Sequence, residues 1–83
     1  MFLDTNLDGR ITTLFLERLN REVTSIQTDL LETGILDSLA FVELIYHVEQ
    51  EFGVQVSVDD LEIDNFRSIA KIAEFISQRL GTS

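Results

Sequence analysis

Cysteine and proline are both absent from this 83-residue sequence, and the absence of cysteine excludes the most. Without cysteine, the chain has neither a disulfide to brace the fold nor thiolates for a metal site. The sequence also lacks an apolar run long enough to cross a membrane, and Asp4 interrupts the opening apolar residues too early for a secretory signal. These absences predict a cytoplasmic protein that does not insert into a membrane.

Basic residues are scarce, since six Lys and Arg stand against fifteen Asp and Glu, and the net charge is −9 at pH 7. This charge disfavours nucleic acid and anionic lipid as partners, and it favours a protein with a basic patch. Between residues 29 and 64 every charged side chain is acidic: Asp29, Glu32, Asp37, Glu43, Glu49, Glu51, Asp59, Asp60, Glu62 and Asp64. The simplest interpretation of this block is a solvated acidic face.

The length and the 45% hydrophobic content predict one small domain over residues 1–83, with residues 1–10 as a polar N-terminal arm. A domain of this size has little room for an enclosed active site. A carrying, binding or interaction role is therefore favoured over catalysis.

Apolar spacing predicts an all-α fold, a small bundle of three main helices and one short helix. The first helix is expected over residues 11–23, and the last begins after Ser68 and ends before Gly81. The central helix is expected from Asp37-Ser38 to Phe52-Gly53. Its predicted core stripe is Leu39, Val42, Ile45 and Tyr46, widened by Phe41, Leu44, Val48 and Phe52.

Polar residues and glycines mark the predicted helix ends. Asp37 and Ser68 are expected as N-caps, and Gly53 as the left-handed residue that ends the central helix. Ser57 with Asp60 predicts a short helix over residues 58–63. The connection at residues 24–37 is expected to pack on the helices through its apolar side chains: Leu30, Leu31, Ile35 and Leu36.

Ser38 is the most informative residue, because it places a hydroxyl at the start of the central helix, after an aspartate cap. Helix starts suit phosphate groups. As a nucleophile Ser38 lacks a base, since the one histidine, His47, is about 13 Å further along a helix. No catalytic residue is predicted. Taken alone, an Asp-Ser helix start is most often only a cap.

Three sequence segments resemble the acyl carrier protein superfamily: residues 32–39 (ETGILDSL), 42–44 (VEL) and 49–54 (EQEFGV). The resemblance implies a helical carrier whose Ser38, between Asp37 and Leu39, holds 4′-phosphopantetheine derived from coenzyme A. With Leu36 directly before the aspartate, the motif is more similar to discrete D-alanyl and other aminoacyl carriers than to fatty-acid carriers. The cargo itself stays open.

The same resemblance implies partners that read the acidic helix at Glu43, Glu49 and Glu51. These partners would be a phosphopantetheinyl transferase, an acyl or aminoacyl ligase, and a downstream transferase or synthase with basic docking patches. A monomer is expected of such a carrier. The alternative is a small acidic helical adaptor that binds a basic partner without a prosthetic group.

Two metal-binding patterns are set aside. Residues 4–11 match the start of an EF-hand calcium loop, but Phe15 occupies the position of the required glutamate. His47 has Glu43 and Glu51 one turn to either side, and an exposed set of this kind rarely forms a specific site. No metal site is predicted.

Overall fold

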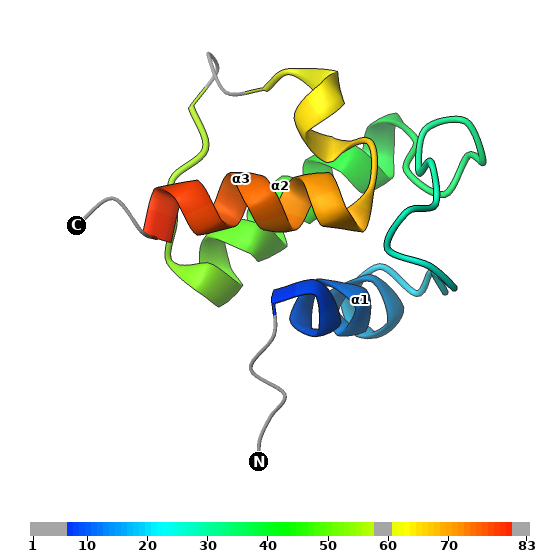
Figure 1. Cartoon of the computed structure of the whole chain (residues 1–83), viewed down its shortest axis with the longest axis horizontal. Coiled ribbons are helices and arrows are strands. Elements are labelled where there is room, and N and C mark those ends of the chain that lie inside the picture. Colours follow the sequence, from blue (N-terminus) through cyan, green and yellow to red (C-terminus); the bar gives the residue numbers. More distant parts are fainter. Residues whose placement is uncertain (1–6, 58–60, 81–83) are drawn as a thin grey trace.

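The protein is all-helical over the part described by the computed structural model, residues 7–57 and 61–80 (Figure 1). Its elements are α1 (Leu7–Arg18), α2 (Ser38–Phe52), the 3-10 helix η2 (Ile63–Phe66) and α3 (Ile69–Leu80). No strand occurs within these ranges. The predicted bundle of three main helices and one short helix is confirmed.

Helix α1 begins and ends earlier than predicted. It starts at Leu7 rather than Ile11, so residues 7–10, expected to belong to the polar arm, are helical. It ends at Arg18 because Asn20 takes a left-handed backbone, with φ 61°. Residues 1–6 of the expected arm, with the start of the calcium-like pattern, lie outside the described residues.

Helix α2 has the bounds that its capping residues predicted. The Asp37 carboxylate accepts a hydrogen bond from the Ala40 N–H at 2.9 Å, which satisfies a first-turn donor. At the other end, Gly53 has φ 69° and donates its N–H to the Glu49 carbonyl at 3.0 Å. Both predicted caps are confirmed.

The predicted apolar face of α2 is right only in part: Leu44, Val48 and Phe52, predicted to widen the stripe, are buried, and Phe41 and Ile45 pack partly buried against the core. The buried side chains are Ala40, Leu44, Val48 and Phe52. Leu39, Val42 and Tyr46 are instead 69%, 65% and 58% exposed. Apolar residues surround most of this helix, so its own pattern could not select the side that packs on the other elements.

The chain between α2 and α3 contains a short helix, which overlaps the described part of the predicted range only at Ile63. Residues 58–60 lie outside the described part, and Leu61 and Glu62 are not helical. The 3-10 helix follows at Ile63–Phe66, with the Phe66 side chain buried. The buried Phe66 side chain anchors this turn to the core.

Helix α3 begins as predicted, with the Ser68 hydroxyl accepting from the Lys71 N–H at 3.2 Å. Its buried face comprises Ile69, Ile72, Ala73, Phe75 and Ile76. Gly81, the predicted end, lies outside the described residues. Phe75 packs against Phe66 with ring centroids 5.4 Å apart, and Phe66 meets the Phe41 ring edge-on at 5.2 Å.

The connection between α1 and α2 closes one end of the bundle, beside the start of α3 (Figure 1). Leu30 and Leu36 are fully buried, and Leu31 and Ile35 pack partly buried against the same core, as predicted. Among the described helices, none is long and apolar enough to cross a membrane.

Candidate functional site

Ser38 is the first residue of α2, and its side chain is exposed. The backbone beneath it is held on both sides. Asp37 caps the helix, its carbonyl accepts from the Phe41 N–H at 2.8 Å, and Ala40 is buried in the core. The Ser38 hydroxyl therefore projects into solvent from a backbone that is fixed by these hydrogen bonds and by the packing of Ala40.

The Asp37 carboxylate has a second, weaker partner. Its Oδ2 lies 3.8 Å from the Arg21 guanidinium, and both side chains are well exposed. The pair partly offsets the negative charge beside Ser38. A phosphate ester at Ser38 would thus meet one nearby cation as well as one nearby anion.

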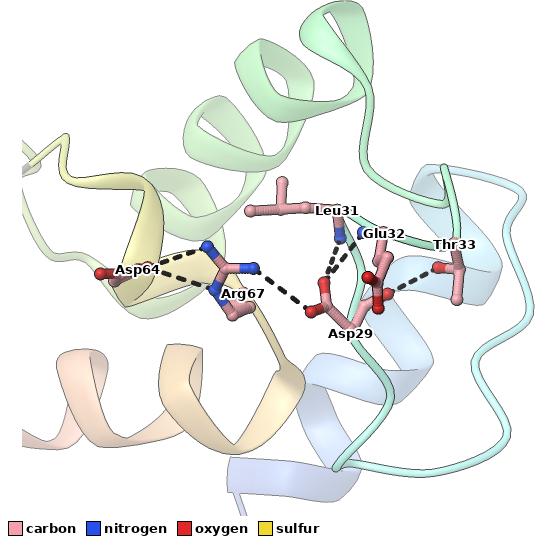
Figure 2. A network of polar contacts seen from close by, with 6 residues as sticks. All are labelled: Asp29, Leu31, Glu32, Thr33, Asp64 and Arg67. Atoms are coloured by element: carbon pink, nitrogen blue, oxygen red, sulfur yellow. Dashed lines mark hydrogen bonds and ion pairs between the residues drawn. The ribbon is translucent and has the colours of Figure 1, made fainter.

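The loop before Ser38 is an ordered turn built on Asp29. Asp29 Oδ1 accepts from the N–H groups of Leu31 at 3.1 Å and Glu32 at 2.9 Å, and the Thr33 hydroxyl donates to the Asp29 carbonyl at 2.7 Å (Figure 2). Asp29 is partly exposed. The hydrogen bond from Glu32 is the largest cause that lowers the pKa of Asp29 below its ordinary value of 3.8, and Arg67 lowers it further.

Arg67 joins this loop to η2. Its Nη1 donates to Asp29 Oδ2 at 3.2 Å, while Nε and Nη2 donate to Asp64 Oδ1 at 3.2 and 3.0 Å (Figure 2). The hydrogen bond to Asp64, followed by that to Asp29, raises the pKa of Arg67 above its ordinary value. Sequence reasoning missed this cluster, because only the fold brings residues 29 and 67 together.

The exposed side of α2 is apolar around the site. Leu39, predicted as part of the attachment motif, lies here with Val42 and Tyr46, and we call these three residues the apolar stripe. Large exposed apolar patches mark interaction surfaces. A signal for this face was present in the sequence, since a helix apolar on most sides of a small bundle cannot bury them all.

A groove of about 310 Å³ runs beside this stripe. It is lined by Phe41, Val42, Ile45, Tyr46, Glu49 and Leu61. The lining residue that follows Ser38 most closely along α2 is Phe41, three residues on, or about 4.5 Å along the helix axis. Ile63, 56% exposed, follows Leu61 in the chain and adds apolar surface to that segment.

The three acidic residues predicted to bind partners differ in their surroundings. Glu43 is exposed. Glu49 is half-buried, and its Oε2 accepts from the Val56 N–H at 2.9 Å. Glu51 lies 3.8 Å from the Arg10 guanidinium, which in turn stacks 4.5 Å over the Phe52 ring. Only Glu43 has its carboxylate unengaged by a neighbour within the described part of the chain.

Neither nucleophilic catalysis nor metal binding gains support from the site. His47 is half-buried and packs edge-on against the Tyr46 ring, with centroids 5.2 Å apart. Within residues 7–57 and 61–80, no three His, Asp or Glu side chains are grouped to hold a metal.

The geometry at Ser38 fits a covalent prosthetic group held through a phosphate ester. The hydroxyl is accessible, and the first-turn N–H groups of a helix, which have no intrahelical acceptor, favour a phosphate. The flanking residues Asp37 and Leu39 are exposed as well, so a modifying enzyme can reach the whole tripeptide.

Comparison with known proteins agrees with this geometry. The family described as "Phosphopantetheine attachment site" matches residues 9–76. The D-alanyl carrier proteins of Streptococcus pyogenes serotypes M1, M5 (strain Manfredo) and M49 (strain NZ131) are each 34% identical over 50 residues. That match spans 60% of this chain and 63% of each relative, less than two thirds of their length.

The family match extends over most of the chain and includes most of α1, all of α2 and η2, and much of α3. The prosthetic group of this family is covalently attached 4′-phosphopantetheine. A carrier of this kind is a substrate of partner enzymes and not itself a catalyst. This chain therefore belongs to the phosphopantetheine attachment site family, within the acyl carrier protein superfamily and similar to its D-alanyl carrier proteins.

Proposed function

We propose that Ser38 Oγ is the attachment point of 4′-phosphopantetheine, and that residues 1–83 form one carrier domain holding an acyl or aminoacyl thioester. The observation that carries this proposal is an exposed hydroxyl on the fixed first residue of α2, within the matched range 9–76. The attached group supplies the thiol that this cysteine-free chain lacks.

Attachment consumes coenzyme A. Ser38 Oγ forms a bond to the β-phosphorus, the pyrophosphate bond breaks, adenosine 3′,5′-bisphosphate leaves, and the hydroxyl proton passes to a base. The base comes from the phosphopantetheinyl transferase, because His47, the one histidine of the sequence, lies about 13 Å further along the helix from Ser38. This chain contributes a fixed, exposed hydroxyl and a docking surface.

The proposed docking surface is the exposed side of α2. The apolar stripe would supply contact area, and Glu43 would meet a basic patch on the transferase, on the ligase and on a downstream transferase or synthase. Glu49 and Glu51 add negative charge, but each already has a partner within the chain. An exposed ion pair contributes about 0–1 kcal/mol, which suits brief visits to several enzymes.

An aminoacyl cargo in a specialised biosynthetic pathway is the finer proposal. It is supported by the similarity to D-alanyl carrier proteins and by Leu36 before the Asp37-Ser38 pair. We further propose a monomer that works in the cytoplasm, consistent with weak docking to several partners. The alternative of an adaptor without a prosthetic group has no specific observation in its favour.

Intact mass spectrometry tests the attachment. The protein is incubated with coenzyme A, magnesium and a broad-specificity phosphopantetheinyl transferase, beside Ser38→Ala and the control Ser77→Ala, which alters an exposed serine on α3. Wild type and Ser77→Ala should each gain one phosphopantetheine, and Ser38→Ala none. Modification of Ser38→Ala, or no gain on wild type while a known carrier is modified in the same tube, would refute the proposal.

A further inference from the structure

Arg67 lies between η2 and α3 and contacts two segments that are far apart in the sequence. Its side chain donates to Asp29 in the loop before Ser38 and to Asp64 in η2 (Figure 2). A planar guanidinium can hold two carboxylates in a fixed mutual geometry, whereas a lysine ammonium is a single flexible point of charge. We call Asp29, Asp64 and Arg67 the clasp.

The backbone beside the clasp extends the connection toward Ser38. The Leu30 N–H donates to the Arg67 carbonyl at 2.7 Å, and the Leu36 N–H donates to the Leu30 carbonyl at 2.9 Å. Leu36 directly precedes Asp37, the cap of α2. A continuous path of hydrogen bonds and covalent bonds therefore leads from Arg67 to the residue that orients Ser38.

The other arm of the clasp reaches the segment across from the apolar stripe. Asp64 belongs to η2, which begins at Ile63, and Leu61 just before it lines the groove on α2. Arg67 thus ties together the loop that leads into Ser38 and the segment that completes the groove. Neither segment belongs to an α-helix, and within each the backbone makes short turn-type hydrogen bonds, such as Thr33 N–H to the Asp29 carbonyl and Asn65 N–H to the Glu62 carbonyl.

We propose that Arg67 is a positioning residue: it keeps the loop at residues 29–37 and the segment at residues 61–66 in one arrangement, so that Ser38 and the groove reach a partner enzyme as one preformed surface. The inference rests on the proposed role of Ser38. A partner that needs this arrangement binds with an apparent affinity reduced by the fraction of molecules that hold it. Loss of the clasp therefore raises KM and leaves kcat unchanged.

The variants that test this are Arg67→Ala and Arg67→Lys, with Lys71→Ala as the matched control. Lys71 is an exposed basic residue in the first turn of α3, four residues beyond Arg67, so its removal changes the net charge equally without touching the clasp. The assay is the initial rate of phosphopantetheine transfer from coenzyme A at increasing carrier concentration. All variants are compared at a temperature where circular dichroism shows them folded.

Arg67→Ala should raise KM by roughly twofold to threefold, which corresponds to the arrangement being populated about half to one third of the time. Arg67→Lys should have a KM between those of wild type and Arg67→Ala, because a lysine ammonium cannot hold both carboxylates in the geometry that the planar guanidinium fixes. Lys71→Ala should change KM only through the loss of one positive charge, so its KM is the value with which that of Arg67→Ala is compared. Equal KM values for Arg67→Ala and Lys71→Ala would overturn the inference.

Amide hydrogen exchange supplies a second readout, which does not depend on any enzyme. In Arg67→Ala the amides of Leu30, Glu32 and Leu36 should exchange several-fold faster, while those of Leu44 and Val48 inside α2 keep the wild-type rate. A uniform increase would indicate only global destabilisation and would count against positioning. If wild type fails to be modified at all, the carrier proposal fails, and the exchange data still decide whether the clasp holds the loop.

Discussion

Arg67 Nη1 lies 3.2 Å from Asp29 Oδ2 across a separation of 38 residues, and it makes this contact while the same guanidinium holds Asp64. The loop that leads into α2 is therefore attached to the start of α3 by side chains as well as by the backbone bond from Leu30 to Arg67.

The Asp29 turn should weaken in acid. The pKa of Asp29 is lowered on folding, first by the backbone hydrogen bond from Glu32 and then by Arg67, so its stabilising contribution is complete above the ordinary value of 3.8. It is lost as the pH falls below 3.8 through the folded value. Arg67 and Asp64 are the charged groups beside it, and Glu32 adjoins it in the turn.

An NMR titration of the Asp29 carboxyl carbon measures this. In Arg67→Ala its pKa should move upward toward 3.8 but stay below it, because the Glu32 hydrogen bond remains. Asp64→Asn serves as a comparison that keeps Arg67 in the chain. A titration of wild-type Asp29 at or above 3.8 would contradict the lowered value.

The apolar stripe should matter for docking and little for folding. Val42→Gln and Tyr46→Gln remove exposed apolar surface from α2, while Leu16→Gln removes a comparably exposed side chain, 54%, from α1. Exposed substitutions of this kind usually change the free energy of unfolding by no more than about 0.5 kcal/mol. We expect the two α2 variants to slow phosphopantetheine transfer and Leu16→Gln to leave it unchanged.

Chemical denaturation and the transfer assay check this pair of expectations. Equal transfer rates for the α2 variants and Leu16→Gln would show that the stripe takes no part in docking. Leu44→Ala provides the opposite control, since Leu44 is fully buried and its truncation should cost about 2–5 kcal/mol of stability.

The two glutamates Glu43 and Glu49 should separate docking from stability. Glu43→Ala removes an exposed carboxylate, so it should weaken transfer at low salt and leave the unfolding midpoint close to wild type. Glu49→Ala removes the acceptor of the Val56 N–H and should cost about 0.5–1.5 kcal/mol of unfolding free energy. Transfer rates at low and high salt, beside urea unfolding, distinguish them. Equal transfer rates and equal unfolding free energies for the two variants would contradict the separate roles of Glu43 in docking and Glu49 in stability.

The Asp37 cap should contribute to folding independently of attachment at Ser38. Asp37→Ala loses the acceptor for the Ala40 N–H and should cost about 0.5–2 kcal/mol of stability, whereas Asp37→Asn, which keeps an acceptor oxygen, should cost less. Ser38→Ala leaves the Asp37 carboxylate in place as the acceptor for the Ala40 N–H, so this variant should unfold close to wild type. Thermal unfolding of the three variants, all without the prosthetic group, tests the order. A larger loss for Ser38→Ala than for Asp37→Ala would show that the serine, not the aspartate, holds the helix start.

The sequence by itself determined the features that depend on neighbouring residues. The bounds of α2 follow from Asp37 and Gly53, because a cap acts on donors and acceptors within a few residues of itself. The all-α class follows from helical spacing, and the proposal that Ser38 is the attachment point comes from the resemblance of residues 32–39 to the carrier family. Burial of Leu30 and Leu36 also followed, since a solvated loop has no use for such side chains.

Only the tertiary structure decided which side of α2 faces the core, where the short helix forms, and which charged residues meet. Leu39 and Leu44 are equally apolar, so the packing of α1, α3 and Phe66, not local pattern, left one exposed and buried the other. Arg67 meets Asp29 because the chain returns on itself after 38 residues. Local chemistry sets where helices begin and end, whereas side selection and long-range ion pairs depend on the packed arrangement of all the elements together.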